Sequence, residues 1–121
     1  MLRLTSTLLR RCSVFEKISK GELPARVVYE DEQCQVIHDI SPVSPVHLLV
    51  YPRKKIARLS TAEEGDHPLL GHLLGVAAKT AKAQGLEGYR VVINVGEDGG
   101  QTIDHLHLHV VGGRKQCWPP G

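Results

Sequence analysis

A row of three histidines near the carboxyl end of the sequence restricts what this chain can fold into. His105, His107 and His109 (the histidine row) alternate with apolar residues over the segment 105–111. Strict alternation predicts a β-strand, because successive side chains of a strand point to opposite faces. We therefore expect the three imidazoles on one face of a sheet and the intervening leucines and valine on the other.

Three interpretations of the histidine row are open. Single histidines in a sheet are most often structural, but three at a spacing of two are unusual as background. One zinc ion would not easily bind the whole row, because His105 and His109 lie about 13 Å apart on an ideal strand and Zn–N bonds are about 2.1 Å. A pair could bind metal with other ligands, yet the sequence has no Cys-x-x-Cys or His-Glu-x-x-His. The third interpretation is attack by a neutral imidazole on an anionic substrate.

The segment before the row is rich in glycine and favours the third interpretation. Gly96, Gly99 and Gly100 permit backbone conformations that turn consecutive N–H groups inward, which creates an anion-binding nest. A strand follows this loop, so it is neither a Walker A nor a Rossmann motif. By itself it would be an ordinary hairpin loop; next to the histidines it is a candidate phosphate cradle.

The remaining sequence predicts a single α+β domain. The expected elements are a short helix from the Ser13-x-x-Glu16 capping box to near Gly21, strands at 26–29, 34–38, 47–51 and 89–94, and a long helix between Pro68 and Gly85. With the histidine strand, this order indicates a largely antiparallel sheet. The chain has 121 residues, which is enough for one core.

Charge and composition exclude some classes of partner. The net charge is +2, from 15 basic and 13 acidic residues, and no segment approaches the roughly 18 apolar residues of a membrane span. We therefore expect neither a nucleic-acid nor a membrane partner. Cys12, Cys34 and Cys117 are an odd number without a secretory signal, which predicts reduced thiols inside the cell.

Residues 1–12 form a basic extension that contains Leu, Ser, Thr and Arg but no acidic residue. This composition is typical of a mitochondrial transit peptide, and equally of a flexible basic tail. The expected location is therefore the cytoplasm or the mitochondrion.

The chain resembles a known family. His105 to Val111 matches the His-x-His-x-His-x-x signature (x apolar) of the histidine-triad (HIT) superfamily. Further segments look like its Hint branch: 38–42, 45–50, 70–73, 88–94, 99–102, 112–114 and 118–121. The resemblance covers roughly residues 13–121. It implies a HIT domain with a five-stranded antiparallel sheet, one long and one short helix, and a homodimer whose sheets join across a two-fold axis.

The resemblance also implies a reaction, namely hydrolysis of the P–N bond of adenosine or guanosine 5′-phosphoramidates, with acyl- and aminoacyl-adenylates as further candidate substrates. His107 would attack phosphorus and form a nucleotidyl-histidine. His109 would bind phosphate oxygen and help to move a proton to the leaving nitrogen, and His105 would orient the row. His47 would support the row's second histidine, and the Thr102 hydroxyl would lie near the leaving group.

Nucleotide-binding residues can be assigned by the same resemblance. Asp39 would accept hydrogen bonds from the ribose hydroxyls, although its position before Ser41 also suits a turn. His38 and Ile40 would flank the base and sugar. Phosphate would be held by Asn94 and by Gly100, Gln101, Thr102 and Ile103. Val14, Phe15 and Ile18 would form one wall of the base pocket, or simply belong to the core.

The chain also departs from its relatives. Some carry Cys-x-x-Cys and zinc at the amino end, but Ser13 and Glu16 occupy those positions, so we expect neither zinc nor another cofactor. Asp104 stands where an aromatic or apolar residue is common, and it should face away from the histidine row. Trp118 would reach toward the partner's site, unless the tail packs on its own subunit.

Two other functions are compatible with the sequence. A dinucleoside polyphosphate hydrolase would use the same histidines on P–O bonds, although the Trp-Pro-Pro-Gly tail and Gly112-Gly113-Arg114 favour the Hint branch. A nucleotide-binding interaction protein would bind the same ligand with only incidental catalysis. A metal-binding module is a more distant third.

Overall fold

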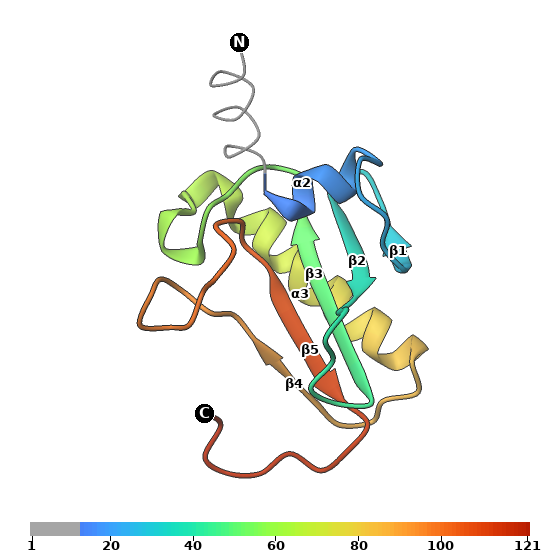
Figure 1. Cartoon of the computed structure of the whole chain (residues 1–121). Coiled ribbons are helices and arrows are strands. Elements are labelled where there is room, and N and C mark those ends of the chain that lie inside the picture. Colours follow the sequence, from blue (N-terminus) through green and yellow to red (C-terminus); the bar gives the residue numbers. More distant parts are fainter. Residues whose placement is uncertain (1–12) are drawn as a thin grey trace.

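The computed structural model describes residues 13–121, so the extension 1–12 and its predicted targeting role lie outside the described residues. This part of the chain folds into a five-stranded sheet in the order β1-β2-β3-β5-β4, with antiparallel neighbours throughout (Figure 1). A long helix, α3, covers one face, and a short helix, α2, lies at the other. The predicted α+β fold is confirmed.

The elements have the following bounds: α2 Val14–Ser19, β1 Val27–Glu30, β2 Cys34–His38, β3 Val46–Pro52, α3 His67–Ala83, β4 Tyr89–Val92 and β5 Leu108–Gly112. Two short 3-10 helices, η1 Leu59–Thr61 and η2 Glu64–Asp66, precede α3 in the described chain. The predicted elements are therefore present, with β4 ending two residues earlier than residue 94.

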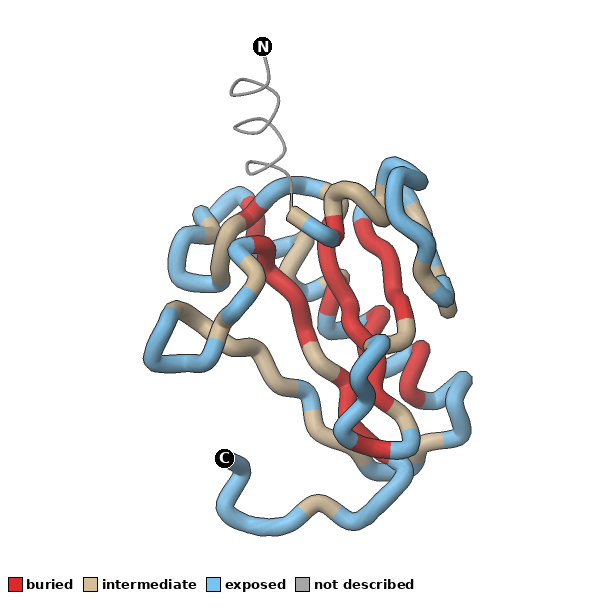
Figure 2. The backbone as a smooth tube through the Cα atoms, in the orientation of Figure 1, coloured by how far each residue is buried: buried red, intermediate tan, exposed pale blue. Residues whose placement is uncertain are grey.

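Alternation along the central strands divides the core into two clusters. Leu48 and Val50 of β3, with Val110 of β5, belong to the cluster beneath α3. Leu49 and Tyr51 of β3 belong to the second cluster, with Phe15 of α2. Because neighbouring residues of a strand face opposite ways, β3 is buried on both sides. Figure 2 shows the buried backbone concentrated in these central strands.

The histidine strand is shorter than predicted. β5 begins at Leu108, so residues 105–107 are not part of it. The β3–β5 register pairs Val50 with Leu108, so the next ladder positions would need Pro52, which has no N–H to donate. The Leu106 amide instead donates to the Ile56 carbonyl at 2.7 Å. The side-chain pattern indicated a strand here, but the residue of β3 that would lie opposite Leu106 is Pro52, which cannot donate to the ladder.

Helix α2 begins with the predicted capping box. The Ser13 hydroxyl accepts a hydrogen bond from the Glu16 amide at 3.0 Å, and the Glu16 carboxylate accepts one from the Ser13 amide at 3.0 Å. The helix ends at Ser19, two residues before Gly21, which has a φ of 78°. Phe15 is 1% exposed and stacks on Tyr51 with a ring-centroid distance of 4.4 Å. The capped turn thus presses one aromatic ring onto the sheet.

Helix α3 packs along one side and leaves the other side open. Its buried residues are Leu73, Val76, Ala77, Thr80 and Ala81. These recur at spacings of three and four, as an amphipathic helix requires. Among the small residues of α3, Ala77 and Ala81 are buried in the cluster beneath the helix, whereas Gly71, Gly75 and Ala78 are exposed. Within residues 13–121, no helix has the length and hydropathy needed to cross a bilayer.

Two adjacent leucines of α3 test this packing. Leu73 is 0% exposed and Leu74 is 51% exposed. We expect Leu73→Ala to lower the free energy of unfolding by about 2–5 kcal/mol, because it removes buried methyl groups and leaves a cavity. Leu74→Ala should change it by less than about 0.5 kcal/mol. Urea denaturation followed by circular dichroism measures both values, and equal losses would contradict this placement of α3.

Candidate functional site

The histidine row lies on the face of the sheet that α2 covers. The ring centroid of Phe15 is 5.7 Å from that of His105 and 4.9 Å from that of His107. The rings of His107 and His109 are 5.1 Å apart. Leu106, Leu108 and Val110 are instead buried in the cluster beneath α3. The predicted separation of imidazoles from apolar side chains is therefore confirmed, although only part of the segment is a strand.

The His107 ring is held by a backbone carbonyl. Its Nδ1 lies 2.7 Å from the carbonyl oxygen of His105, and the residue is 7% exposed. A carbonyl oxygen can only accept, so the proton of a neutral His107 ring is on Nδ1. The lone pair is then on Nε2. This is the arrangement that an imidazole nucleophile needs.

His105 is fully buried and makes two hydrogen bonds through its ring. Nε2 donates to the Pro52 carbonyl at 2.8 Å, and Nδ1 lies 2.7 Å from the Ser13 hydroxyl. Burial lowers the pKa of His105, which favours the neutral ring. Both ring nitrogens of His105 are therefore held by protein groups, and its role in orienting the row stays a prediction. The capping box predicted Ser13 as a helix cap but not as a partner of His105, because no local pattern links positions 92 residues apart.

His109 interacts with His47 from the neighbouring strand. Nε2 of His47 lies 2.9 Å from Nδ1 of His109, while Nδ1 of His47 accepts from the Val43 amide at 3.2 Å. His47 therefore donates and Nδ1 of His109 accepts, which leaves the proton of neutral His109 on Nε2. We expected His47 to support His107, and this was wrong. In the β3–β5 register Leu49 lies opposite His109, and His47 reaches His109 from two residues along β3.

Burial strongly perturbs His109. It lowers the pKa of His109 to about 4, with smaller contributions from the neighbouring imidazoles of His107 and His47. Asp39 acts in the opposite direction, and its carboxylate lies 3.5 Å from Nε2 of His47. His109 is therefore neutral near pH 7 in the free protein.

An apolar pocket of about 350 Å³ lies between α2 and the sheet. Its lining contains seven residues assigned above to nucleotide binding, namely Val14, Phe15, Ile18, His38, Asp39, Ile40 and Ile103. It also contains Leu23, Pro24, Ile37 and Leu49, which the family resemblance did not assign to nucleotide binding. The alternation along β2 and β3 could have indicated Ile37 and Leu49, whereas Leu23 and Pro24 gave no sequence signal.

Asp39 fulfils the turn role and also reaches the pocket. One carboxylate oxygen accepts from the Ser41 amide at 2.7 Å. The residue still lines the apolar pocket beside Ile40, which is 97% exposed. The two roles considered for Asp39 are therefore compatible in space, because a carboxylate has more than one acceptor site.

The glycine-rich loop uses several of its own donors. The Gly100 amide donates to the Glu97 carbonyl at 3.0 Å, and the Gln101 amide donates to the Gly96 carbonyl at 3.0 Å. The Gln101 side chain accepts from the Gly96 amide and donates to the carbonyls of Ala57 and Ile103. The Gly100 and Gln101 amides therefore close the loop in this structure, and their role in holding phosphate stays a prediction. Among contacts between described residues, the amides of Thr102 and Ile103 have no protein acceptor.

Two further pockets receive the remaining predicted residues. Thr102 and Asp104 line a polar pocket with Arg58, and Arg58 forms an ion pair with Asp104 at 3.1 Å. The Asp104 carboxylate is thus turned to Arg58, in agreement with the expectation that it faces away from the row. Asn94 lines a separate pocket with His109 and His47, so it lies near the row and not in the apolar pocket.

Within residues 13–121, two groups bring three possible metal-ligand atoms within 4.8 Å of one another. They are Asp39, His47 and His109, and Asp31, Cys34 and His72. Hydrogen bonds explain both arrangements, since His72 lies 2.7 Å from Asp31 and His47 lies 2.9 Å from His109. Burial raises the pKa of the Cys34 thiol to about 12, so it is protonated at neutral pH. The absence of a metal cofactor stays a prediction.

The carboxy-terminal tail extends from the sheet without burying its aromatic residue. Trp118 is 84% exposed. Arg90 of β4 donates to the Cys117 carbonyl, which holds the tail next to the edge strand of the sheet. Packing of Trp118 on its own subunit is therefore not observed.

The lowered pKa of His109 predicts how stability depends on pH. The unfolded chain binds a proton near pH 6.5 and the native site only near pH 4, so stability is lost as the pH falls between these values. We expect His109→Gln to reduce the loss between about pH 7 and about pH 5, as measured by urea denaturation. Part of the pH-dependent loss of stability should remain in this variant, because burial also lowers the pKa values of His105 and His38. An unchanged difference between the two pH values would contradict this role of His109.

Comparison with known proteins agrees with this geometry. The HIT domain family model matches residues 20–116. An uncharacterized HIT-like protein of Synechococcus elongatus is 50% identical over 110 residues, covering 90% of this chain and 96% of its own. A HIT family hydrolase from Legionella pneumophila superimposes with a TM-score of 0.89 at 46% identity, over 91% of this chain and 100% of its own. A histidine triad nucleotide-binding protein from Candida albicans gives a TM-score of 0.73 at 27% identity, over 88% and 85% of the two chains. The chain therefore belongs to the HIT domain family.

Proposed function

We propose that this protein hydrolyses the P–N bond of purine nucleoside 5′-phosphoramidates, and of related acyl- or aminoacyl-adenylates, through a nucleotidyl-histidine. The observation that carries the proposal is the His107 ring, whose Nδ1 donates to the His105 carbonyl at 2.7 Å so that Nε2 keeps its lone pair. The names of two relatives support it, since one is called a hydrolase and the other a nucleotide-binding protein.

The apolar pocket suits a nucleoside. Its apolar lining residues from α2 and β3 can enclose the faces of a purine base, which are themselves apolar. Asp39 at the same pocket offers carboxylate oxygens to ribose hydroxyls, which donate hydrogen bonds. Phe15 packs against both the pocket and the His107 ring, so a base bound there places its 5′-phosphate toward the histidine row.

The first chemical step forms an N–P bond and breaks another. Nε2 of His107 attacks the α-phosphorus, and the amine nitrogen leaves with the electron pair of the substrate P–N bond. The nitrogen must gain a proton as it leaves. A bound phosphate anion raises the pKa of a nearby imidazole, which offsets the burial that lowers the pKa of His109 to about 4. Protonated His109, whose Nδ1 then no longer accepts from His47, donates its Nε2 proton to this nitrogen, while the amides of Thr102 and Ile103 stabilise the phosphate charge.

The second step returns the enzyme to its starting state. Water attacks the phosphorus of the nucleotidyl-histidine, and the now neutral His109 accepts the proton of this water. The P–N bond to His107 breaks and the nucleotide monophosphate is released. His109 then loses the proton to solvent, because burial again lowers its pKa to about 4 once the phosphate has left. Dividing one displacement into two in this way is the usual advantage of covalent catalysis.

Replacing the nucleophile tests the proposed reaction. His107→Ala should lower turnover of adenosine 5′-phosphoramidate by more than about tenfold, equivalent to roughly 1.4 kcal/mol of barrier. Intact-mass spectra of the wild type during turnover should show the protein plus one nucleotidyl group. His67→Ala, an exposed histidine at the start of α3, serves as the matched control and should turn over normally.

The outcomes separate the candidate functions. Diadenosine polyphosphate assayed in parallel distinguishes P–N from P–O cleavage. Turnover of His107→Ala above about a tenth of wild type, the same factor as above, would contradict its role as nucleophile. No turnover of either substrate, together with micromolar nucleotide binding, would contradict the proposed hydrolase and favour a nucleotide-binding interaction protein.

We further propose that the protein is a homodimer joined through β4. Among the described strands, β4 lies at one end of the sheet order, and β1 lies at the other. An edge strand offers unpaired backbone groups to a second copy, and a two-fold contact would continue the sheet. The exposed Trp118 tail runs from the end of β5 and is held by Arg90 of β4, so it lies at the edge where a partner would dock.

A matched pair of edge substitutions tests the dimer. Val91 of β4 is 37% exposed, and Val27 of β1 is 44% exposed. Val91→Asp should shift the protein to monomer in sedimentation velocity, because two carboxylates would meet near the two-fold axis and repel. Val27→Asp should remain dimeric. A monomeric wild type would contradict the homodimer, and dissociation of only the Val27 variant would place the contact at β1.

A further inference from the structure

Two hydrogen bonds, with His105 between them, connect Ser13 at the start of α2 to the proposed nucleophile, His107. The Ser13 hydroxyl lies 2.7 Å from Nδ1 of His105. The opposite nitrogen of that ring donates to the Pro52 carbonyl at 2.8 Å. The carbonyl of His105 itself accepts from Nδ1 of His107 at 2.7 Å. Ser13 is therefore two hydrogen bonds and one residue away from the reacting imidazole.

The direction of each of these bonds follows from the partners. The Pro52 carbonyl can only accept, so Nε2 of His105 carries a proton and Nδ1 of the neutral ring carries a lone pair. The Ser13 hydroxyl must then donate to Nδ1. Its oxygen is free to accept, and it does so from the Glu16 amide at 3.0 Å. Both capacities of the hydroxyl are used, which ties the orientation of the His105 ring to the first turn of α2.

We propose that Ser13 is a positioning residue for His107, because its hydroxyl holds the His105 ring and thereby the His105 carbonyl that orients the nucleophile. The inference rests on the proposed function, in which His107 attacks phosphorus. It adds a residue outside the histidine row to the machinery. His105 is 0% exposed in this structure, so the Ser13 hydroxyl, and not bulk solvent, is the partner of its Nδ1.

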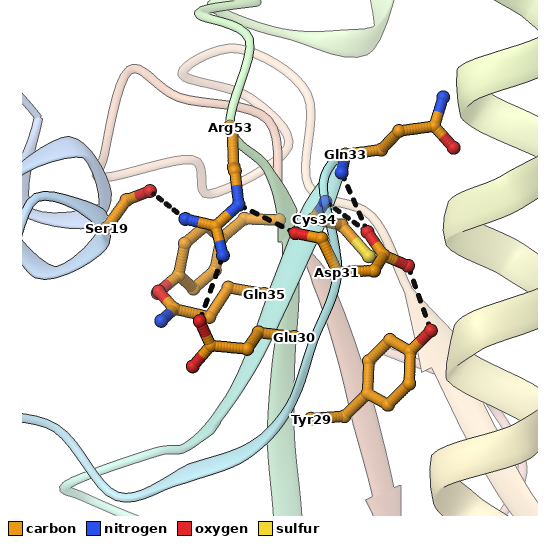
Figure 3. Close-up of polar contacts among 9 residues, drawn as sticks. Ser19, Tyr29, Glu30, Asp31, Gln33, Cys34, Gln35 and Arg53 are labelled. Carbon is orange, nitrogen blue, oxygen red and sulfur yellow. Dashed lines mark hydrogen bonds and ion pairs between the residues drawn. The ribbon is translucent and has the colours of Figure 1, made fainter.

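Ser13 also caps α2, and the two roles must be separated. α2 has a second attachment at its other end, where Arg53 donates to the Ser19 hydroxyl at 2.9 Å (Figure 3). Arg53 also donates to the Asp31 carbonyl at 2.8 Å and to the Glu30 carboxylate at 3.2 Å. Losing the Ser19 contact loosens α2 without touching His105. Ser19→Ala is therefore the matched control for a general loosening of the helix.

The two roles predict different kinetic changes. Val14, Phe15 and Ile18 of α2 line the apolar pocket, so a loosened helix weakens substrate binding and raises KM. A displaced His107 ring instead lowers kcat, because small misplacements of a reacting group slow the chemical step. The ratio of the two effects therefore reports which role Ser13 has.

The experiment compares Ser13→Gly, Ser13→Thr and Ser19→Ala with the wild type on adenosine 5′-phosphoramidate. Glycine is almost as good an N-cap as serine but has no hydroxyl, whereas threonine keeps both functions. We expect Ser13→Gly to lower kcat by about tenfold with KM changed less than about twofold. Ser13→Thr should keep kcat within about threefold of wild type, and Ser19→Ala should keep it within about twofold.

A substrate-free measurement keeps the inference independent of turnover. Long-range ¹H–¹⁵N NMR spectra of the histidine rings should show neutral His105 protonated at Nε2 and neutral His107 protonated at Nδ1. In Ser13→Gly, the His107 ring should become a mixture of tautomers, whereas Ser19→Ala should leave it unchanged. If this mixture is seen but the wild type cleaves no phosphoramidate, the positioning role stands and the proposed reaction fails.

Two results would overturn the inference. The first is a Ser13→Gly variant whose kcat and His107 ring signals equal those of the wild type. The second is a rise in KM that is the same in Ser13→Gly and Ser19→Ala with kcat unchanged, since Ser13 would then act only as a helix cap. Thermal unfolding of all three variants confirms that each is folded at the assay temperature.

Discussion

Burial of the central strands on both faces is the constraint on which this structure depends. Leu48 and Val50 of β3 must meet α3, so Leu49 and Tyr51 necessarily face α2. The same alternation sends the leucines between the histidines under α3 and turns all three imidazoles to the α2 side. The site is therefore a by-product of core formation, because any shift by one residue would bury the histidines beneath the long helix.

Fixed hydrogen-bond directions make the neighbouring rings of His107 and His109 differ at Nε2. His105 and His107 end on backbone carbonyls, which can only accept, and this leaves Nε2 of His107 with a lone pair. His47 and His109 end on the Val43 amide, which can only donate, and this leaves Nε2 of His109 with a proton. The neutral rings of His107 and His109 thus present opposite groups at Nε2, a lone pair and a proton, because the backbone groups at the end of each set of bonds differ.

Local patterns predicted much of this arrangement. The Ser13-x-x-Glu16 spacing located α2, and Pro68 and Gly85 marked the limits of α3 to within two residues. The motif resemblance selected most of the residues that line the apolar pocket. The alternation of the histidine row did not locate the start of β5. A strand needs a partner that donates N–H groups, and the last residue of β3, Pro52, has none. The resemblance also did not show that the Gly100 and Gln101 amides donate within the loop.

The amino-acid sequence by itself therefore determined the family, the α+β class and the side of the sheet that carries the imidazoles, since these depend on periodicity and on motifs of neighbouring residues. Only the tertiary structure decided that His47 contacts His109, that Ser13 contacts His105, and which nitrogen of each ring is free. These contacts join residues that are 62 and 92 positions apart. Their geometry depends on strand register and on the docking of α2, which no local pattern of side chains encodes.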